Sequence, residues 1–255
     1  MVRPKKSLGQ HFLIDDSVIQ KLVNALTGHG NYTNVLEVGP GTGVMTKYLL
    51  ETDRTIHAIE MDRESIPYLK QHYPDLTPRL IEGDFLKLDL NQIVDGSLAI
   101  IGNFPYYIST QIFFRVLEER EKVPEMVGMV QKEVGQRIAA PPGSKTYGIL
   151  SVLVQTYYDV EMLFIVPPEA FNPPPKIDSA VIRFRRNDRA EIPCGYAKLK
   201  MVVKLAFNQR RKTLRNALKS LTFSTNPEEG ILAKRAEQLS VDQFIALTCC
   251  VDSTS

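Results

Sequence analysis

The sequence has few cysteines, no long apolar run and almost no net charge, and each of these absences excludes a class of protein. Its three cysteines, Cys194, Cys249 and Cys250, are an odd set without Cys-x-x-Cys spacing. They indicate neither a disulfide framework nor a thiolate zinc site. No stretch approaches the roughly 20 apolar residues of a membrane span, and no hydrophobic leader follows the first methionine. We therefore expect a cytoplasmic protein with no membrane partner.

The composition is that of an ordinary globular protein. The chain has 255 residues, of which 44% are hydrophobic and 24% charged. These values exclude a disordered or collagen-like chain, and the length suits one large domain or one domain with a smaller partner.

The net charge of +2 hides an uneven distribution. Residues 1–175 carry 16 Lys and Arg against 21 Asp and Glu, whereas residues 176–255 carry 15 against 8. Residues 176–220 alone carry 13 against 3. Such a block either attracts a polyanion or forms a solvated helical surface, and charge alone does not separate the two.

Short β-branched runs alternate with helical stretches, which predicts an α/β fold with a seven-stranded, mostly parallel sheet. The expected strands are 35–38, 55–60, 79–82, 98–101, 125–130, 160–166 and 179–184. The last two are separated by a proline-rich stretch too short for a helical crossover, so we expect one antiparallel strand near the sheet edge.

A second, smaller domain is expected after a polar linker at 187–194. We assign residues 1–190 to the sheet domain and 191–255 to a basic, all-helical C-terminal domain. Leu199, Val202, Val203 and Ala206 recur at helical spacing, and further helices are predicted near 212–221, 228–239 and 241–249, the last with Ser240 as its N-cap.

A glycine-rich turn follows the first predicted strand, at residues 37–43 (Glu-Val-Gly-Pro-Gly-Thr-Gly). Glycines at such a turn let the backbone approach a ligand. The dinucleotide fingerprint Gly-x-Gly-x-x-Gly does not fit, because Gly43 comes one residue early, so hydride transfer is disfavoured. The spacing instead resembles the motif of S-adenosylmethionine-dependent methyltransferases, and implies a Rossmann-like methyltransferase fold.

Two acidic residues support a nucleoside cofactor. Glu60 ends the second predicted strand, where a carboxylate can accept hydrogen bonds from a ribose diol. Asp84 follows the third strand and could accept from an adenine amino group. Because parallel strands end at one edge of a sheet, we expect both acids beside the glycine turn.

The fourth predicted strand leads into Asn103-Phe104-Pro105-Tyr106-Tyr107, which suits chemistry on an exocyclic adenine nitrogen. That nitrogen is a poor nucleophile until hydrogen bonds localise its lone pair. The Asn103 side-chain oxygen and the carbonyl of Phe104 or Pro105 could accept its two N–H bonds, while Tyr106 or Tyr107 offers a stacking face. The four histidines lack metal-ligand spacing, and no metal is expected.

Taken in order, these motifs resemble a known family, the small-subunit ribosomal RNA adenine dimethyltransferases (KsgA/RsmA). The resemblance spans almost the whole chain and is carried by the motifs above together with residues 7–13, 131–134, 147–152, 171–181 and 207–216. The chief departure is Phe104, where the family usually has Leu.

The resemblance implies transfer of methyl groups from S-adenosylmethionine, released as S-adenosylhomocysteine, to N6 of two adjacent adenosines near the 3′ end of small-subunit (16S) rRNA. It implies a monomer that acts in maturation of the small ribosomal subunit. The cofactor residues would be His11, Leu13, Gly39, Gly41, Glu60, Asp84 and Asn103, and the target base would be handled by Asn103, Pro105, Tyr106 and Phe171.

The basic block then becomes a candidate rRNA-binding surface. We assign rRNA phosphates to Arg210, Arg211, Lys212 and Arg215, joined by Arg183, Arg185, Arg186, Arg3, Lys5 and Lys6. Two alternatives remain open: a large-subunit rRNA adenine-N6 methyltransferase of the macrolide-resistance type, and a non-catalytic rRNA-binding assembly factor.

Overall fold

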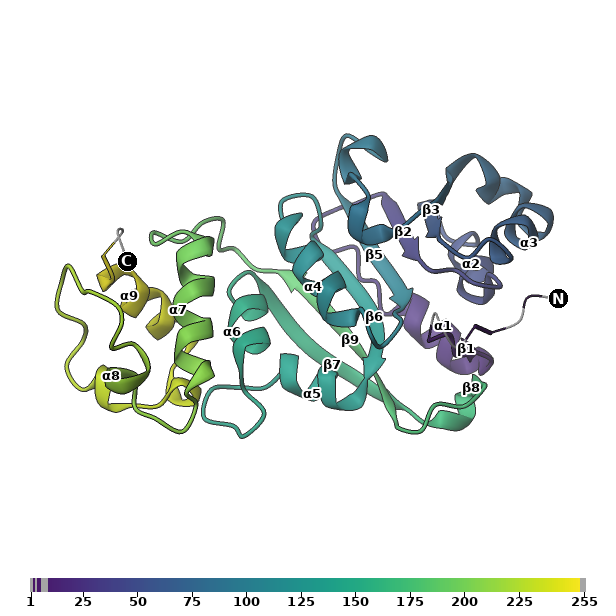
Figure 1. The fold of residues 1–255 in the computed structure, drawn as a ribbon. Coiled ribbons are helices and arrows are strands. Elements are labelled where there is room, and N and C mark those ends of the chain that lie inside the picture. Colours follow the sequence, from purple (N-terminus) through teal and green to yellow (C-terminus); the bar gives the residue numbers. More distant parts are fainter. Residues whose placement is uncertain (1, 3, 6–8, 253–255) are drawn as a thin grey trace. The chain divides into compact units, whose positions relative to one another are not determined.

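The chain folds into two compact units, which are described separately below. The structure is a computed structural model and describes residues 2, 4–5 and 9–252 (Figure 1). Residues 1–135 and 159–186 form the first unit, and residues 136–158 and 187–255 form the second. Within the described part of the chain, no helix is both long and apolar enough to cross a membrane.

A seven-stranded sheet is the centre of the first unit and confirms the predicted α/β architecture (Figure 1). The strands lie in the order β4-β3-β2-β5-β6-β9-β7, and the five from β4 to β6 are parallel. β9 runs antiparallel to β6, which confirms the single reversed strand. The bounds are β2 Asn34–Val38, β3 Thr55–Glu60, β4 Leu80–Glu82, β5 Leu98–Asn103, β6 Glu125–Gln131, β7 Tyr158–Val166 and β9 Ser179–Arg186.

The central strands are mostly apolar, as expected for parallel strands whose two faces are both covered. Val35 and Leu36 of β2, and Ile100 and Ile101 of β5, are fully buried. The register aligns Val38 of β2 with Ile59 of β3, and Glu60 with Glu82 of β4. The carboxyl ends of β2, β3, β4 and β5 therefore meet at one sheet edge, where doubly wound folds bind ligands.

Four helices belong wholly to this unit: α1 Asp16–Asn24, α2 Val44–Leu49, α3 Ser65–His72 and α4 Ser109–Glu118. In α1 the apolar residues Val18, Ile19, Leu22 and Val23 form one buried stripe. Asp15 precedes it as N-cap and accepts from the amides of Ser17 and Val18, which would otherwise lack partners at the helix start.

A second, two-stranded sheet was not predicted. β1 (Phe12–Leu13) pairs antiparallel with β8 (Phe171–Asn172), with Leu13 opposite Phe171. Strands of two residues are too short to show a periodic pattern. This pairing brings the residues before α1 beside the proline-rich segment that follows β7.

Helices dominate the second unit. They are α6 Ile149–Gln155, α7 Tyr196–Asn208, α8 Leu214–Ala217 and α9 Val241–Cys250, while α5 Lys132–Ile138 crosses the division between the units. α7 carries the predicted buried stripe, and Ser240 caps α9 by accepting from the amide of Gln243. A helical C-terminal part is thereby confirmed.

Two details of this unit differ from the predictions. The predicted helix at 228–239 consists of two 3-10 turns, Ile231–Ala233 and Ala236–Gln238, because Gly230 has a positive φ and Arg235 is extended to pair with Thr213. Residues 136–158 lie in the second unit, not the first, because α6 packs against α7 and α9. The order of elements along the sequence does not show that residues 136–158 pack with the C-terminal helices.

Candidate functional site

The glycine turn after β2 adopts a backbone that other residues rarely tolerate. Gly39, Gly41 and Gly43 have φ values of 70°, 58° and 76°. A side chain at Gly43 would also collide with Tyr73, since its Cβ would lie 2.2 Å from the Tyr73 ring. The turn is tied to the neighbouring strand because the Gly39 amide donates to the Ile59 carbonyl over 2.9 Å. The glycines are thus required by backbone geometry.

A pocket opens at the sheet edge where β2, β3, β4 and β5 end. It is lined by residues 9–12, 59–61, 83–85 and 103–108, with Val38, Gly39 and Gly41. All these residues belong to the first unit. The predicted site residues His11, Gly39, Gly41, Glu60, Asp84, Asn103, Pro105 and Tyr106 therefore line one cavity. Sequence reasoning had assigned no site role to Gln10, Phe12, Met61, Gly83 or Phe85.

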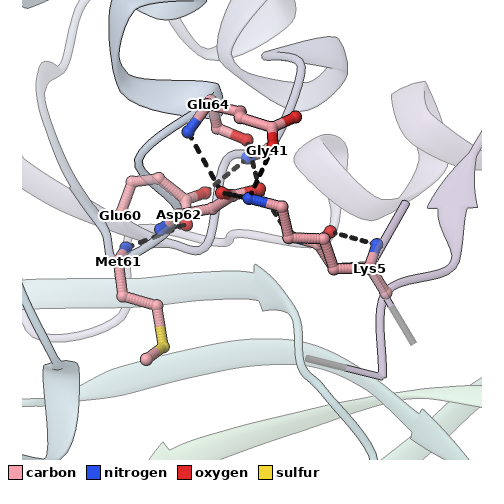
Figure 2. A network of polar contacts seen from close by, with 8 residues as sticks. Lys5, Gly41, Glu60, Met61, Asp62 and Glu64 are labelled. Atoms are coloured by element: carbon pink, nitrogen blue, oxygen red, sulfur yellow. Dashed lines mark hydrogen bonds and ion pairs between the residues drawn. The ribbon is translucent and has the colours of Figure 1, made fainter. Parts of the chain in front are cut away.

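Glu60 is the best-anchored side chain of the pocket and is only 4% exposed. Its Oε1 accepts from the amides of Met61 and Asp62, at 2.9 and 2.8 Å, and its Oε2 accepts from the Gly41 amide at 2.9 Å (Figure 2). A carboxylate has about four acceptor positions, so about one remains for a ligand. Burial raises the pKa of Glu60, an effect that the three amides oppose.

A second acid, Glu37, lies in the sheet below the glycine turn and is fully buried. Its Oε2 accepts from the Thr46 hydroxyl at 2.6 Å, which ties β2 to α2. Burial raises the pKa of Glu37 to about 7, and the nearby Glu60 adds to the effect. Glu37 does not line the pocket, so we assign it a structural role.

Asp84 is fixed by the turn that follows β4. One carboxylate oxygen, Oδ1, accepts from the Leu86 amide at 3.0 Å and caps the 3-10 turn Phe85–Lys87. The Gly83 amide donates to the Glu60 carbonyl at 2.9 Å, so the ends of β3 and β4 are joined just before Asp84. Both predicted nucleoside-binding acids thereby face the same cavity.

Asn103 ends β5 with its carboxamide held in one orientation. Its Nδ2 donates to the backbone carbonyl of His11 over 2.9 Å. A carbonyl oxygen can only accept, so the amide nitrogen must face it and Oδ1 must point the other way. The Pro105 carbonyl already accepts from the Ile108 amide at 3.1 Å, which favours the Phe104 carbonyl as the second acceptor for a bound amine.

Phe104 departs from the usual Leu of the resembled family, and its larger ring has a dedicated space. The ring is 1% exposed and lies over Gly102 of β5 and Gly128 of β6, which are directly paired. A Cβ at Gly128 would lie 2.1 Å from this ring, and one at Gly102 would lie 2.6 Å from it. Gly102 and Gly128, on adjacent strands, thus leave room for Phe at position 104 in place of the usual Leu.

Tyr106 and His11 form a pair of stacked rings at the pocket, with centroids 5.8 Å apart and an interplanar angle of 23°. The Tyr106 hydroxyl bonds to the hydroxyl of buried Ser179 at 2.6 Å. His11 Nδ1 lies 2.7 Å from the Pro173 carbonyl, and since that oxygen only accepts, Nδ1 carries the hydrogen. Tyr107 also lines the pocket but is 56% exposed.

Two predicted site residues lie outside the pocket. Leu13 and Phe171 face each other in the β1–β8 pair, are 1% and 2% exposed, and belong to the hydrophobic core. Neither side chain therefore lines the pocket in this structure, and the roles of Leu13 in binding the cofactor and of Phe171 in handling the target base remain predictions. The physical reason is the alternation of β1, which turns Phe12 toward the pocket and Leu13 into the core.

Several predicted rRNA-binding residues have protein partners instead. Arg183 and Arg185 both pair with Glu161, and Arg186 donates to the carbonyls of Arg120 and Glu121. Arg210 donates to the Lys145 carbonyl at 2.6 Å and pairs with Glu237 at 3.7 Å, so it anchors the 143–145 loop. Lys5 pairs with Asp62. Arg3 and Lys6 lie outside the described residues, as do Ser7 and Leu8 of the N-terminal motif.

The remaining predicted cations are exposed. Arg211, Lys212 and Arg215 follow α7 and enter α8, and the described part of the chain gives none of the three an ion pair. The second unit as a whole carries 13 Lys and Arg against 7 Asp and Glu. The set of predicted rRNA-binding cations without a protein partner is therefore smaller than the sequence indicated and, within the described residues, consists of Arg211, Lys212 and Arg215.

Two solved structures resemble the fold closely. A dimethyladenosine transferase from Plasmodium falciparum superposes with a TM-score of 0.77 at 22% identity, covering 94% of this chain and 99% of the other. The 23S rRNA methyltransferase ErmE gives a TM-score of 0.73 at 22% identity, covering 95% and 100%. At such identities the likeness concerns the fold, which is that of Rossmann-like methyltransferases.

Sequence comparison gives the family. The family model described as "Ribosomal RNA adenine dimethylase" matches residues 1–249. Proteins named ribosomal RNA small subunit methyltransferase A are 54% identical over 250 residues in Cytophaga hutchinsonii, covering 97% of this chain and 96% of the relative, and 52% identical over 250 residues in Parabacteroides distasonis, covering 97% and 94%. The chain thus belongs to the ribosomal RNA adenine dimethylase family and is a methyltransferase.

Proposed function

We propose that this enzyme transfers methyl groups from S-adenosylmethionine to N6 of two adjacent adenosines near the 3′ end of 16S rRNA, two to each base. The observation that carries the proposal is the orientation of Asn103, whose carboxamide nitrogen is held by the His11 carbonyl while its oxygen is left to accept. The relatives at about 50% identity are all named for the small ribosomal subunit, which supports this substrate.

The pocket residues fit a nucleoside with a charged amino-acid tail. Gly39 and Gly41, at positive φ, let the backbone approach the methionine portion of S-adenosylmethionine. Glu60 would accept from the ribose and Asp84 from the adenine amino group, while His11 would border the cofactor. Because three amides already bind Glu60, a bidentate contact with both ribose hydroxyls requires one of them, such as Gly41's, to give way. When bound, the cofactor supplies a methyl group on sulfonium and leaves as S-adenosylhomocysteine.

Asn103 prepares the target nitrogen for methylation. Its Oδ1 and the Phe104 carbonyl accept the two N–H bonds of the adenine amine, which draws the nitrogen lone pair out of the ring plane. The amine starts neutral, so no side chain must remove a proton before attack. The nitrogen gains a bond to the methyl carbon as the bond from that carbon to sulfur breaks, and it afterwards releases one proton to water. Repetition on the same amine gives the dimethylated base, after rotation about the carbon–nitrogen bond.

Tyr106 serves as the platform for the extruded base. Stacking of a base on an aromatic ring contributes about 1 to 3 kcal/mol, which offsets a cost of a few kcal/mol for unstacking it from the RNA. The bond between the Tyr106 hydroxyl and Ser179 holds this ring in place. Phe171 is left out of the platform because it lies in the core.

Recognition of the rRNA is assigned to the exposed cations Arg211, Lys212 and Arg215 of the second unit. Phosphate contacts of this kind add affinity that falls as salt rises. We propose that the partner is the small ribosomal subunit or its precursor, that the enzyme acts on it as a monomer in the cytoplasm, and that it contributes to subunit maturation. A non-catalytic assembly factor would not need Glu60, Asp84 and Asn103 together at one pocket.

Large-subunit methylation is the alternative to be separated by experiment. Small and large subunits from an unmethylated strain are offered with labelled S-adenosylmethionine, and modified bases are mapped. We expect label on two adjacent adenosines of 16S rRNA alone, each dimethylated. Label in 23S rRNA, or at a position other than N6, would overturn the assignment.

Asn103→Ala tests the chemistry directly. It removes the acceptor for the amine but leaves Glu60 and Asp84 untouched, so methyl transfer should fall by about two to three orders of magnitude. Calorimetric affinity for S-adenosylmethionine should stay within a few-fold of the wild type. Asn91→Ala, on an exposed turn, is the control and should transfer normally. Normal turnover in Asn103→Ala would remove its assigned role.

A further inference from the structure

Asp62 is a buried acid beside the pocket with no role in the chemistry above. It lies two residues after Glu60, is 2% exposed, and does not line the cavity. Its Oδ1 is 2.5 Å from the Lys5 ammonium and also accepts from the Glu64 amide (Figure 2). Its Oδ2 accepts from Gln10 Nε2 at 3.4 Å. Its side chain therefore joins the end of β3 to the N-terminal segment, 57 residues away in sequence.

Lys5 and Gln10 are also bonded to each other. The Lys5 amide donates to Gln10 Oε1 at 2.9 Å, and the Gln10 amide donates to the Lys5 carbonyl at 3.3 Å. The two residues are thus bonded to each other and are both attached to Asp62. Lys5 lies in addition 3.1 Å from Glu64, so two carboxylates hold one ammonium.

Gln10 and the two residues after it form one wall of the pocket. Gln10, His11 and Phe12 all line it. The Phe12 ring lies over Gly41, where a Cβ would be 3.0 Å away, and the His11 carbonyl holds Asn103 Nδ2. Displacing this segment would open the cavity and release the carboxamide that receives the target amine.

The two partners of the Lys5–Asp62 ion pair differ in their exposure to water. Asp62 is nearly inaccessible to water, whereas the Lys5 side chain is 32% exposed. A buried carboxylate without its cation is strongly disfavoured, because removing one partner leaves an uncompensated charge. The pull of Lys5 keeps the pKa of Asp62 below its usual value although burial opposes this. Closing the segment over the pocket is therefore coupled to neutralising Asp62.

We propose that the Lys5–Asp62 ion pair is a latch that holds residues 9–12 over the cofactor pocket and thereby positions Asn103. Lys5 and Asp62 are positioning residues, since neither reaches the reacting atoms. The proposal rests on the proposed function in one respect, that the pocket receives S-adenosylmethionine. When the Lys5–Asp62 ion pair is formed, the cofactor is retained and the Asn103 oxygen is in place to accept from the amine. When the ion pair is broken, the cofactor and the Asn103 side chain are both held less firmly.

Lys5→Met tests the latch by removing the charge while keeping much of the side-chain length. We expect the Kd for S-adenosylmethionine, measured by calorimetry, to rise about tenfold, with a parallel rise in KM for the cofactor. We also expect kcat to fall several-fold because Asn103 loses its fixed partner. Amide hydrogen exchange in residues 9–13 should become faster in the ligand-free protein. Lys5→Arg, which keeps the charge, should leave all four quantities close to those of the wild type.

Two further variants make the result specific. Lys70→Met is the matched control, because Lys70 pairs with Glu82 at 2.6 Å on the same unit but neither residue lines the pocket. It should behave as the wild type. Asp62→Asn approaches the latch from the other side, keeps the acceptor for the Glu64 amide, and should reproduce the effects of Lys5→Met.

The outcomes separate the latch from the proposed function. Unchanged exchange in residues 9–13 and unchanged cofactor affinity in Lys5→Met would overturn the latch, and so would equal effects in Lys70→Met. Failure of the wild-type protein to bind S-adenosylmethionine would instead overturn the cofactor assignment. The exchange measurement on ligand-free protein tests the closure of the segment in either case.

Discussion

Two of the site side chains, those of Asn103 and His11, are oriented by single hydrogen bonds to carbonyl oxygens. The His11 carbonyl fixes the carboxamide of Asn103, and the Pro173 carbonyl fixes the ring of His11. Since both acceptors are backbone carbonyls, no acidic side chain is needed to hold either orientation. The two hydroxyl groups of Tyr106 and Ser179 are the exception, because side chains alone hold that ring in place.

Removing either hydroxyl should therefore have the same consequence. Tyr106→Phe and Ser179→Ala each break the bond of 2.6 Å, and Ser179 is fully buried. We expect each to lower kcat/KM for rRNA several-fold and to leave the cofactor Kd unchanged, with a coupling energy of about 1 kcal/mol in the double-mutant cycle. Tyr107→Phe, at the exposed neighbour, is the control. Strictly additive losses would show that the two hydroxyls act independently.

Residues at strand ends were predictable, whereas residues that act through distant partners were not. Glu60, Asp84 and Asn103 could be placed because each follows an apolar run, and parallel strands end at one edge. Ser179 and Asp62 gave no signal, since their importance depends on bonds to residues 73 and 57 positions away. A single sequence does not contain those pairings.

At the scale of elements, the paired strands β5 and β6 shape the loop that carries Asn103. Gly102 and Gly128 face each other across these strands, and the Phe104 ring fills the space above them. This arrangement links the sheet interior to the reaction site through one aromatic side chain. The loop is therefore held in two ways. The Phe104 ring packs over the two glycines, and Asn103 Nδ2 donates to the His11 carbonyl of the N-terminal segment.

Gly128→Ala should consequently impair both stability and catalysis. The new Cβ would lie 2.1 Å from the Phe104 ring, so the ring must move. Overpacking of this kind costs about 1 to 3 kcal/mol, measurable by urea unfolding, and displacement of the loop should lower kcat. Phe104→Leu in the same protein should recover part of both losses. Gly96→Ala, where nothing lies within 4 Å, is the control; an equal loss there would contradict this account.

The larger elements followed from sequence periodicity, and the failures have physical causes. All seven strands of the main sheet, the reversed strand and the helices α7 and α9 were predicted. The β1–β8 pair was missed because it depends on contact between residues about 160 positions apart. The helix expected at 228–239 is replaced by turns because Arg235 pairs with Thr213, a tertiary contact that overrides local helical preference.

At the scale of the whole molecule, charge is divided unequally between the two units. The second unit carries 13 Lys and Arg against 7 Asp and Glu, and the first carries 18 against 22. Many cations of the basic block are held by acids or carbonyls, so the count overstates the charge available to a polyanion. The exposed remainder among the cations predicted to bind rRNA consists of Arg211, Lys212 and Arg215.

Charge reversal at this remainder should weaken rRNA binding in a salt-dependent way. Each lost phosphate contact removes roughly 0.7 to 0.9 from the slope of log K against log salt, so Arg211→Glu with Lys212→Glu should flatten the slope by roughly 1.4 to 1.8. The control reverses two exposed lysines of the first unit, Lys21 and Lys47, giving the same net charge elsewhere. Arg210 is left unchanged because it anchors the 143–145 loop. Equal slopes for the two double variants, measured by filter binding from low to high salt, would mean that net charge alone governs the affinity and that the surface after α7 makes no specific phosphate contacts.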